Sequence, residues 1–121
     1  LARVEEETIV ILQLETAAAI AQAVEIGTTD GVSGIFFGPA DIAADIGLLG
    51  QPLHEDVWAL IKPAAQTLID KGVPVGTLVN DTAFAAQLLN DGFTFVACAT
   101  DTMLLAKACD AALASVRAGI G

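Results

Sequence analysis

The feature that most constrains the fold is a regular alternation of short apolar runs with longer helical stretches. The pattern predicts strands over 8–14, 34–37, 73–78 and 93–98, and helices over 16–26, 55–71, 80–89 and 102–117, with a short helix beginning near Asp41. Four βα units in series call for a parallel sheet covered by helices. We therefore expect an α/β fold.

Two local patterns within this series carry specific expectations. The first apolar run, Thr8–Leu14, is nearly continuous and rich in β-branched residues, which is typical of a strand that is buried on both faces. Pro63 falls inside the helical pattern of 55–71, where proline removes a backbone donor and clashes with the preceding turn. We expect it to kink or divide that helix.

Composition excludes several classes of partner and points to a compartment. The 121 residues carry a net charge of -10, which disfavours binding to nucleic acid or to an anionic membrane surface, because both need clustered Lys and Arg. No apolar run approaches the ~20 residues of a membrane-spanning helix. Cys98 and Cys109 are too few for a disulfide framework. We expect buried free thiols in a cytoplasmic protein.

Polar residues follow the expected strands where functional groups gather in parallel βα folds. Glu15 directly follows an almost wholly apolar strand, and strand alternation points Gln13 to the same side. Asp41 follows the Gly38-Pro39 turn at the next strand end. Because a buried carboxylate is costly unless it is paired or bound to a metal, these residues predict a site for a hard cation such as Mg²⁺ or Mn²⁺.

The same residues also have structural interpretations. Asp41, Asp81 and Asp101 each precede a helical stretch, where Asp is a preferred N-cap. We favour capping for Asp81 and Asp101, whereas capping and metal binding stay equally open for Asp41. Glu15 is favoured for a functional role over a salt bridge at the edge of the sheet. For His54 we expect capping or exposure rather than catalysis, because it lies away from any strand end.

Two segments, Gln13-Leu14-Glu15-Thr16 and Gly34 to Ile42, resemble the metal-dependent pyruvate aldolases of the HpcH/HpaI family in their order and spacing. The resemblance continues through Gly76 to residues 100–105 and covers essentially the whole chain. It implies a (β/α)₈ TIM barrel in which Glu15 and Asp41 hold Mg²⁺, Mn²⁺ or Co²⁺. It also implies that Gln13 contacts the substrate, and that the backbone around Ala40 and Asp41 donates to the pyruvate carboxylate.

The resemblance further implies a class II aldolase that cleaves a 4-hydroxy-2-oxo acid to pyruvate and an aldehyde. The catalytic His and the substrate-binding Arg of the family match no residue here, so no catalytic residue is expected in this chain. Residues 1–121 resemble the last four βα units, the C-terminal half of the barrel, and should be poorly active alone. We expect a homo-oligomer, or pairing with the missing barrel half.

Two alternatives to an aldolase half-barrel stay open. One is a citryl-CoA or malyl-CoA type of lyase, which would use the same two carboxylates on an acyl-CoA substrate. The other is a non-catalytic half-barrel, a fragment or assembly module whose carboxylates only cap helices.

Overall fold

A four-stranded parallel sheet forms the centre of the molecule. The computed structural model describes residues 7–120, and within them every strand pairs with the next one along the chain, in the order β1-β2-β3-β4. The strands are β1 (Ile11–Leu14), β2 (Gly34–Phe37), β3 (Val75–Leu78) and β4 (Phe95–Ala97). The expectation of an α/β fold built from successive βα units is confirmed.

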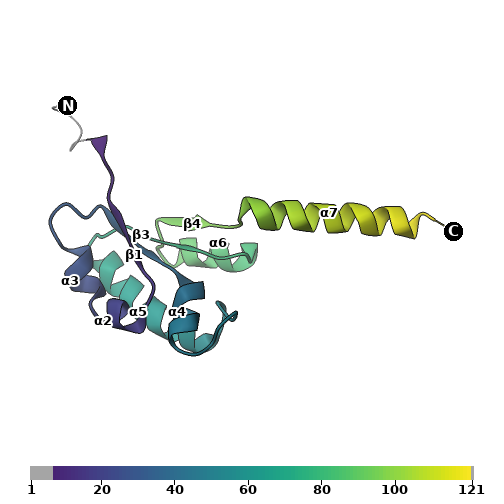
Figure 1. Ribbon diagram of the computed structural model, residues 1–121. Helices are drawn as coiled ribbons and strands as arrows, with labels where there is room; N and C mark the ends of the chain where they lie inside the picture. Colours follow the sequence, from purple (N-terminus) through teal and green to yellow (C-terminus); the bar gives the residue numbers. More distant parts are fainter. Residues whose placement is uncertain (1–6, 121) are drawn as a thin grey trace.

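Helices connect the strands and pack mainly against one face of the sheet. They are α2 (Ala17–Ala21), α3 (Ala23–Gly27), α4 (Pro39–Asp45), α5 (Glu55–Asp70), α6 (Thr82–Asn90) and α7 (Asp101–Ala118). Figure 1 shows α2, α3 and α5 grouped on the same side of the strands, and both α2 and α3 contact α5. Every parallel connection thus contains at least one helix, as such crossovers require.

The hydrophobic core lies between this face of the sheet and α5. Alternate strand residues point into it because successive side chains of a strand face opposite sides. The strand residues buried there are Leu14, Ile35, Phe37, Val75 and Thr77, and the α5 residues buried with them are Val57, Trp58, Ile61, Ala65 and Leu68. The one buried polar side chain of the described residues, Thr77, donates its hydroxyl hydrogen to the Phe37 carbonyl oxygen at 3.0 Å.

The opposite face of the sheet is only partly covered. Gln13, Phe36, Gly76 and Phe95 lie in one row across the four strands. The Phe36 and Phe95 rings stack with centroids 6.0 Å apart, and the Phe95 ring occupies the place that a Cβ atom at Gly76 would need. Ile11 is 46% exposed on this face. The expectation of a first strand buried on both faces is therefore wrong, because helices cover only one face here.

Several element boundaries differ from those expected. The first helix divides at Gln22, whose amide bonds to the Ala19 carbonyl three residues back, at 3.1 Å. Helix α5 runs unbroken through Pro63. Helix α7 begins with Thr100 as its N-cap, whose hydroxyl accepts from Met103 N at 3.3 Å. Asp101 instead bonds the amide of the next residue, so the capping role expected for it belongs to Thr100.

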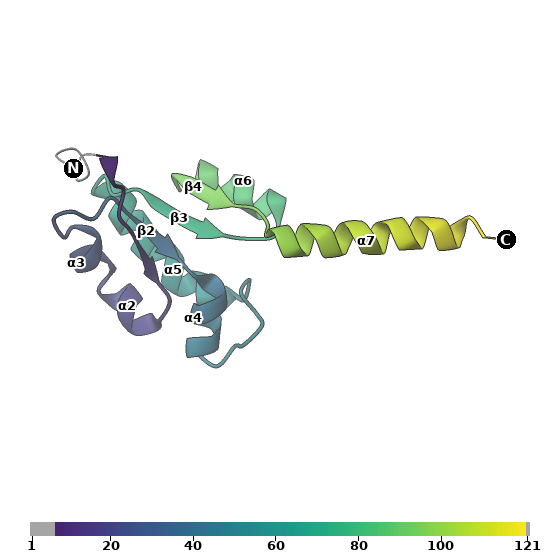
Figure 2. The same ribbon diagram turned by 45° about the horizontal axis from the view of Figure 1, so that its top comes forward.

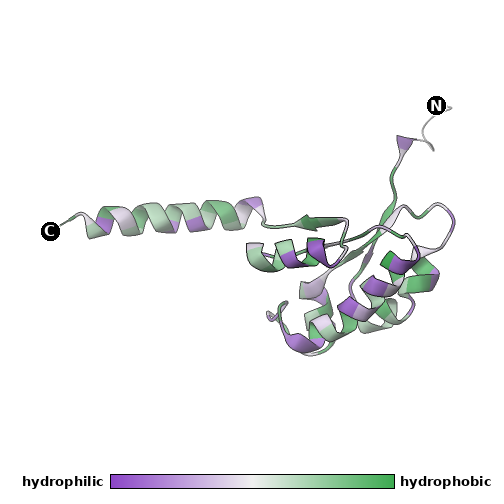
Figure 3. Cartoon of the chain, turned by 180° about the vertical axis from the view of Figure 1, so that it is seen from behind, coloured by the Kyte–Doolittle hydropathy of each residue, from purple (hydrophilic) through white to green (hydrophobic). Residues whose placement is uncertain are grey.

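Helix α7 stands apart from the rest of the molecule. Its 18 residues all lie in the described part of the chain, and none of them is buried. Figure 2 shows the helix extending away from the sheet, and Figure 3 shows hydrophobic and hydrophilic residues alternating along it. Leu105 is 67% exposed. Among residues 7–120, no helix combines the length and the apolar character needed to cross a bilayer.

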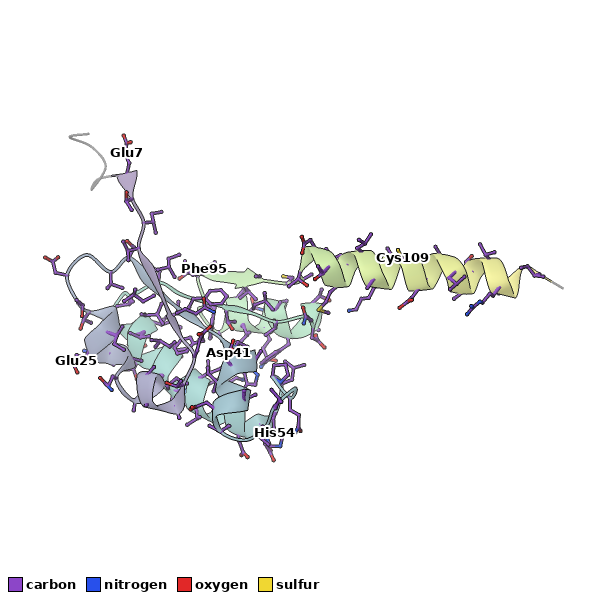
Figure 4. All side chains as sticks on the ribbon, in the orientation of Figure 1. Glu7, Glu25, Asp41, His54, Phe95 and Cys109 are labelled. Atoms are coloured by element: carbon purple, nitrogen blue, oxygen red, sulfur yellow. The ribbon has the colours of Figure 1, made fainter. Side chains whose placement is uncertain are left out.

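The two cysteines are free, as expected, but they are exposed rather than buried. Cys98 follows β4, and Cys109 lies on α7, where Figure 4 shows it far from the body of the molecule. The expectation of burial is wrong for both cysteines, and for Cys109 the reason is that no residue of α7 is buried in the described part of the chain.

Candidate functional site

The first part of the candidate site forms where β1 ends. The side-chain amide nitrogen of Gln13 donates to Glu15 Oε1 at 2.7 Å. Strand alternation predicts that these two side chains share a side, and the structure brings them into direct contact. A hydrogen bond to an ionised acceptor is among the stronger kinds in proteins. The Glu15 carboxylate is therefore held in a defined position just beyond the end of the strand.

Gly38 provides the surface on which this pair rests. A Cβ atom at Gly38 would lie 3.0 Å from Glu15 Cγ and 3.4 Å from Gln13 Nε2. The Gly38 amide also donates to the Leu14 carbonyl at 3.0 Å, which joins the ends of β1 and β2. The missing side chain thus gives Glu15 and Gln13 room to lie across the neighbouring strand end.

Substituting Gly38 tests this packing. In Gly38→Ala the new methyl group should displace the Glu15 side chain by several tenths of an ångström and weaken its bond to Gln13. The side-chain amide resonances of Gln13 should then shift in a ¹⁵N NMR spectrum. Gly119→Ala is the control, because its Cβ would meet nothing closer than 3.6 Å. Unchanged Gln13 resonances in Gly38→Ala would contradict the packing described here.

Asp41 lies in the first turn of α4, and it lines the same pocket as Gln13. Gly38 is the N-cap of α4 and Pro39 occupies its first turn, where a missing N–H costs nothing. The Asp41 side chain is exposed and makes no hydrogen bond or ion pair with residues 7–120. The capping interpretation of Asp41 is therefore wrong, and its carboxylate is available to a ligand.

A pocket of about 250 Å³ opens beside these groups. Its polar lining comes from Gln13, Asp41 and Asn80, and the small residues Gly38 and Ala40 lie between them in the lining. The apolar lining comes from Phe36, Pro39, Pro52, Leu53, Leu78 and Val79. Glu15 does not line the pocket itself, but it contacts two residues that do, Gln13 and Gly38. The pocket therefore combines an acidic, hydrogen-bonding side with an apolar wall.

The donor set suits a hard divalent cation. No cluster of three or more His, Cys, Asp or Glu side chains able to hold a metal occurs in residues 7–120. The described part of the chain thus offers the carboxylates of Glu15 and Asp41. Mg²⁺ is commonly bound by one or two carboxylates and keeps several positions for water and substrate oxygens. The carboxylates of Glu15 and Asp41 are thus of the ligand type that such an ion accepts.

The remaining polar candidates serve local structure. Asp81 caps α6 by accepting from Phe84 N at 2.9 Å. His54 caps α5 through its Nδ1 atom, which accepts from Asp56 N at 3.2 Å. His54 stands at the beginning of α5 and does not line the pocket. The structural interpretations of Asp81 and His54 are confirmed.

Sequence reasoning missed three residues near the site. Leu53 and Asn80 line the pocket, and Asp45 accepts a hydrogen bond from Ala17 N at 2.8 Å. Asn80 stands at a strand end and could have been chosen by position, although it carries no charge. Leu53 lies in the loop between α4 and α5, and Asp45 is the last residue of α4. No spacing pattern in the sequence identifies functional residues at such positions.

The fold and site together define a parallel βα-repeat protein with an acidic pocket at the carboxyl ends of its strands, the arrangement of α/β enzymes. The model of the HpcH/HpaI aldolase/citrate lyase family matches residues 2–108. The chain belongs to that family.

Individual relatives agree with this membership. The chain is 42% identical to the hydroxypyruvate/pyruvate aldolase of Cupriavidus necator over 113 residues, 93% of this chain and 42% of that protein. It is 37% identical to a 4-hydroxy-2-oxo-heptane-1,7-dioate aldolase of Escherichia coli over 111 residues, 92% of this chain and 42% of that protein.

A solved structure shows that the fold is shared as well. A family protein from Burkholderia cenocepacia superposes with a TM-score of 0.85 at 35% identity, covering 93% of this chain and 44% of that one. The chain therefore spans less than half the length of these three relatives.

Proposed function

We propose that this chain supplies the metal and pyruvate site of a class II aldolase, which cleaves a 4-hydroxy-2-oxo acid to pyruvate and an aldehyde. The observation that carries the proposal is the Gln13–Glu15 pair resting on Gly38. Gln13 of that pair lines the same pocket as the unpaired carboxylate of Asp41. Sequence identity of 42% and 37% to two proteins named as aldolases supports an aldolase reaction over that of a CoA-dependent lyase.

Each residue has a role that follows from its position. Glu15 and Asp41 would bind Mg²⁺, Mn²⁺ or Co²⁺ through carboxylate oxygens. When bound, such an ion supplies Lewis-acid polarisation of the 2-oxo group. Gln13 lines the pocket and keeps a carbonyl oxygen and a second N–H for substrate. The backbone N–H groups of Ala40 and Asp41 lie in the first turn of α4, where they lack helical acceptors, and would donate to the pyruvate carboxylate.

The aldolase reaction also needs a base, which we place outside this chain. The single His of the sequence, His54, is engaged in capping α5. We propose that residues 1–121 are the last four βα units of a TIM barrel, and that the other half of the barrel supplies the base. The strands of that half would pair at the outer edges of β1 and β4, and the partly open face would then lie inside the barrel. We also propose that the active protein is an oligomer in the cytoplasm.

A paramagnetic titration tests the metal site directly. Mn²⁺ added to the 121-residue chain should first broaden the NMR signals of Glu15, Gly38, Asp41 and the Gln13 side chain. Pyruvate should tighten Mn²⁺ binding, because its oxygens complete the ion's coordination. First broadening at the acidic residues of α7, Asp101 and Asp110, would contradict the proposal.

Turnover gives a separate test of the division of labour. The isolated chain should show little retro-aldol activity on a 4-hydroxy-2-oxo acid, because general acid–base catalysis typically contributes 10²–10⁴-fold. Pyruvate release can be followed with a coupled dehydrogenase. Normal turnover by the 121 residues alone would contradict the absence of the base from this chain.

A further inference from the structure

We propose that Asp45 is a positioning residue, which joins the two segments that carry Glu15 and Asp41 and so sets their relative placement. Its carboxylate Oδ2 accepts a hydrogen bond from Ala17 N at 2.8 Å. The proposal rests on the proposed function, since it concerns how the same site is held in shape.

The bond lies close to both carboxylates along the chain. Ala17, the first residue of α2, is two residues beyond Glu15, and Asp45, the last residue of α4, lies four residues beyond Asp41. Residues four apart in a helix share one face. A second bond between these ends, from Gly38 N to Leu14 O at 3.0 Å, joins the strands themselves. Asp45 therefore fixes the part of the first unit that extends past its strand.

Helix α2 depends on this outside acceptor. It has five residues and no acidic residue in its first turn. A helix this short is unstable on its own, and a negative charge at its N-terminus is favourable. Thr16 satisfies Ala19 N at 3.1 Å, which leaves Ala17 N to Asp45. The Asp45 carboxylate at the end of α4 thus stabilises the first turn of α2.

The bridging nature of this bond sets Asp45 apart from the other capping residues. Asp81, Thr100 and His54 each bond a backbone N–H two or three residues away, within their own βα unit. The Asp45 bond spans 28 residues and connects the first unit with the second. A residue with this connection affects the distance between units, whereas the others affect only the start of one helix.

Mn²⁺ affinity distinguishes positioning from simple capping. Asp45→Ala should weaken Mn²⁺ binding by the 121-residue chain about tenfold, the size seen when groups that orient metal ligands are removed. Asp45→Asn keeps an oxygen acceptor and should recover most of the affinity. Asp81→Ala is the matched control, because it removes an N-cap bond of similar length, 2.9 Å, at the same carboxyl end of the strands. It should leave the dissociation constant within about twofold.

A dissociation constant within about twofold of wild type for Asp45→Ala, or equal weakening by Asp81→Ala, would overturn the positioning role. A metal-free measurement separates this failure from failure of the proposed function. In Asp45→Ala, hydrogen exchange should accelerate about tenfold at Ala17 and also at Ile42. Ile42 N bonds to the Gly38 carbonyl at 3.0 Å in the second unit. If wild type binds no Mn²⁺, the proposed metal site is wrong. In that case the exchange data alone decide the positioning role. Unchanged exchange at Ile42 in Asp45→Ala would overturn it, and faster exchange at both Ala17 and Ile42 would support it.

Discussion

Glu15→Gln should lower the affinity of the chain for Mn²⁺ on the order of a hundredfold, because a site with two carboxylates loses half of its negative charge. The substitution keeps the size of the side chain, so the packing over Gly38 stays in place. It also keeps an oxygen that can accept the 2.7 Å bond from Gln13. Charge is therefore the main property that changes. Free Mn²⁺ measured by electron paramagnetic resonance gives the dissociation constant.

Glu25→Gln is the control for this experiment. Glu25 is an exposed glutamate on α3, and Figure 4 shows it well apart from Asp41. Its neutralisation changes the net charge of the chain by the same amount and should leave Mn²⁺ affinity unchanged within about twofold, since exposed charges this distant are screened by salt. Equal losses in both variants would show that Mn²⁺ responds to the overall acidity of the chain, with no specific site at Glu15.

Leu68→Ala should destabilise the chain by about 2–5 kcal/mol, the range for removing a fully buried Leu side chain. Leu68 lies on the buried face of α5 with 0% of its surface exposed. Its side chain reaches the space above Gly27, so it fills the contact between α5 and α3. Truncation leaves a cavity that neither helix can close without moving. Chemical denaturation in urea measures the change in the free energy of unfolding.

Leu105→Ala makes the same chemical change at a side chain that is mostly exposed. Leu105 lies on α7 and is 67% exposed. Its replacement should alter the free energy of unfolding by no more than about 0.5 kcal/mol, as is usual for surface positions. Ala is also the better helix former, so helix propensity does not oppose this expectation. A loss as large as that of Leu68→Ala would show that α7 packs against a hydrophobic surface in solution.

Local chemistry explains which parts of the fold could be predicted from the sequence. The strand Gly34–Phe37 has the expected bounds because Gly-Pro stops it abruptly and β-branched and aromatic residues fill it. By contrast, the apolar run before Glu15 has the composition of a strand covered on both sides. Burial on the second face depends on which chain segments lie opposite, and residues 8–14 hold no information about that.

The site divides in the same way. Alternation along one strand was enough to predict that Gln13 and Glu15 share a side, and their hydrogen bond confirms it. The roles of Glu15 and Asp41 as metal ligands stay predictions. The bond from Ala17 N to Asp45 was beyond the reach of pattern reasoning, because it joins residues 28 apart whose meeting depends on how two βα units pack. Thr100 and Asp101 are adjacent, and only the backbone geometry decides which of them caps α7.

The placement of the single tryptophan has an optical consequence. Trp58 is 6% exposed, its indole N–H donates to the Pro52 carbonyl at 2.9 Å, and its ring meets Phe84 edge-on at 4.6 Å. With no tyrosine in the chain, intrinsic fluorescence reports on the core around α5 and is silent for α7. Circular dichroism records both. On heating, an isolated helix melts gradually, so the difference between the two curves isolates the signal of α7.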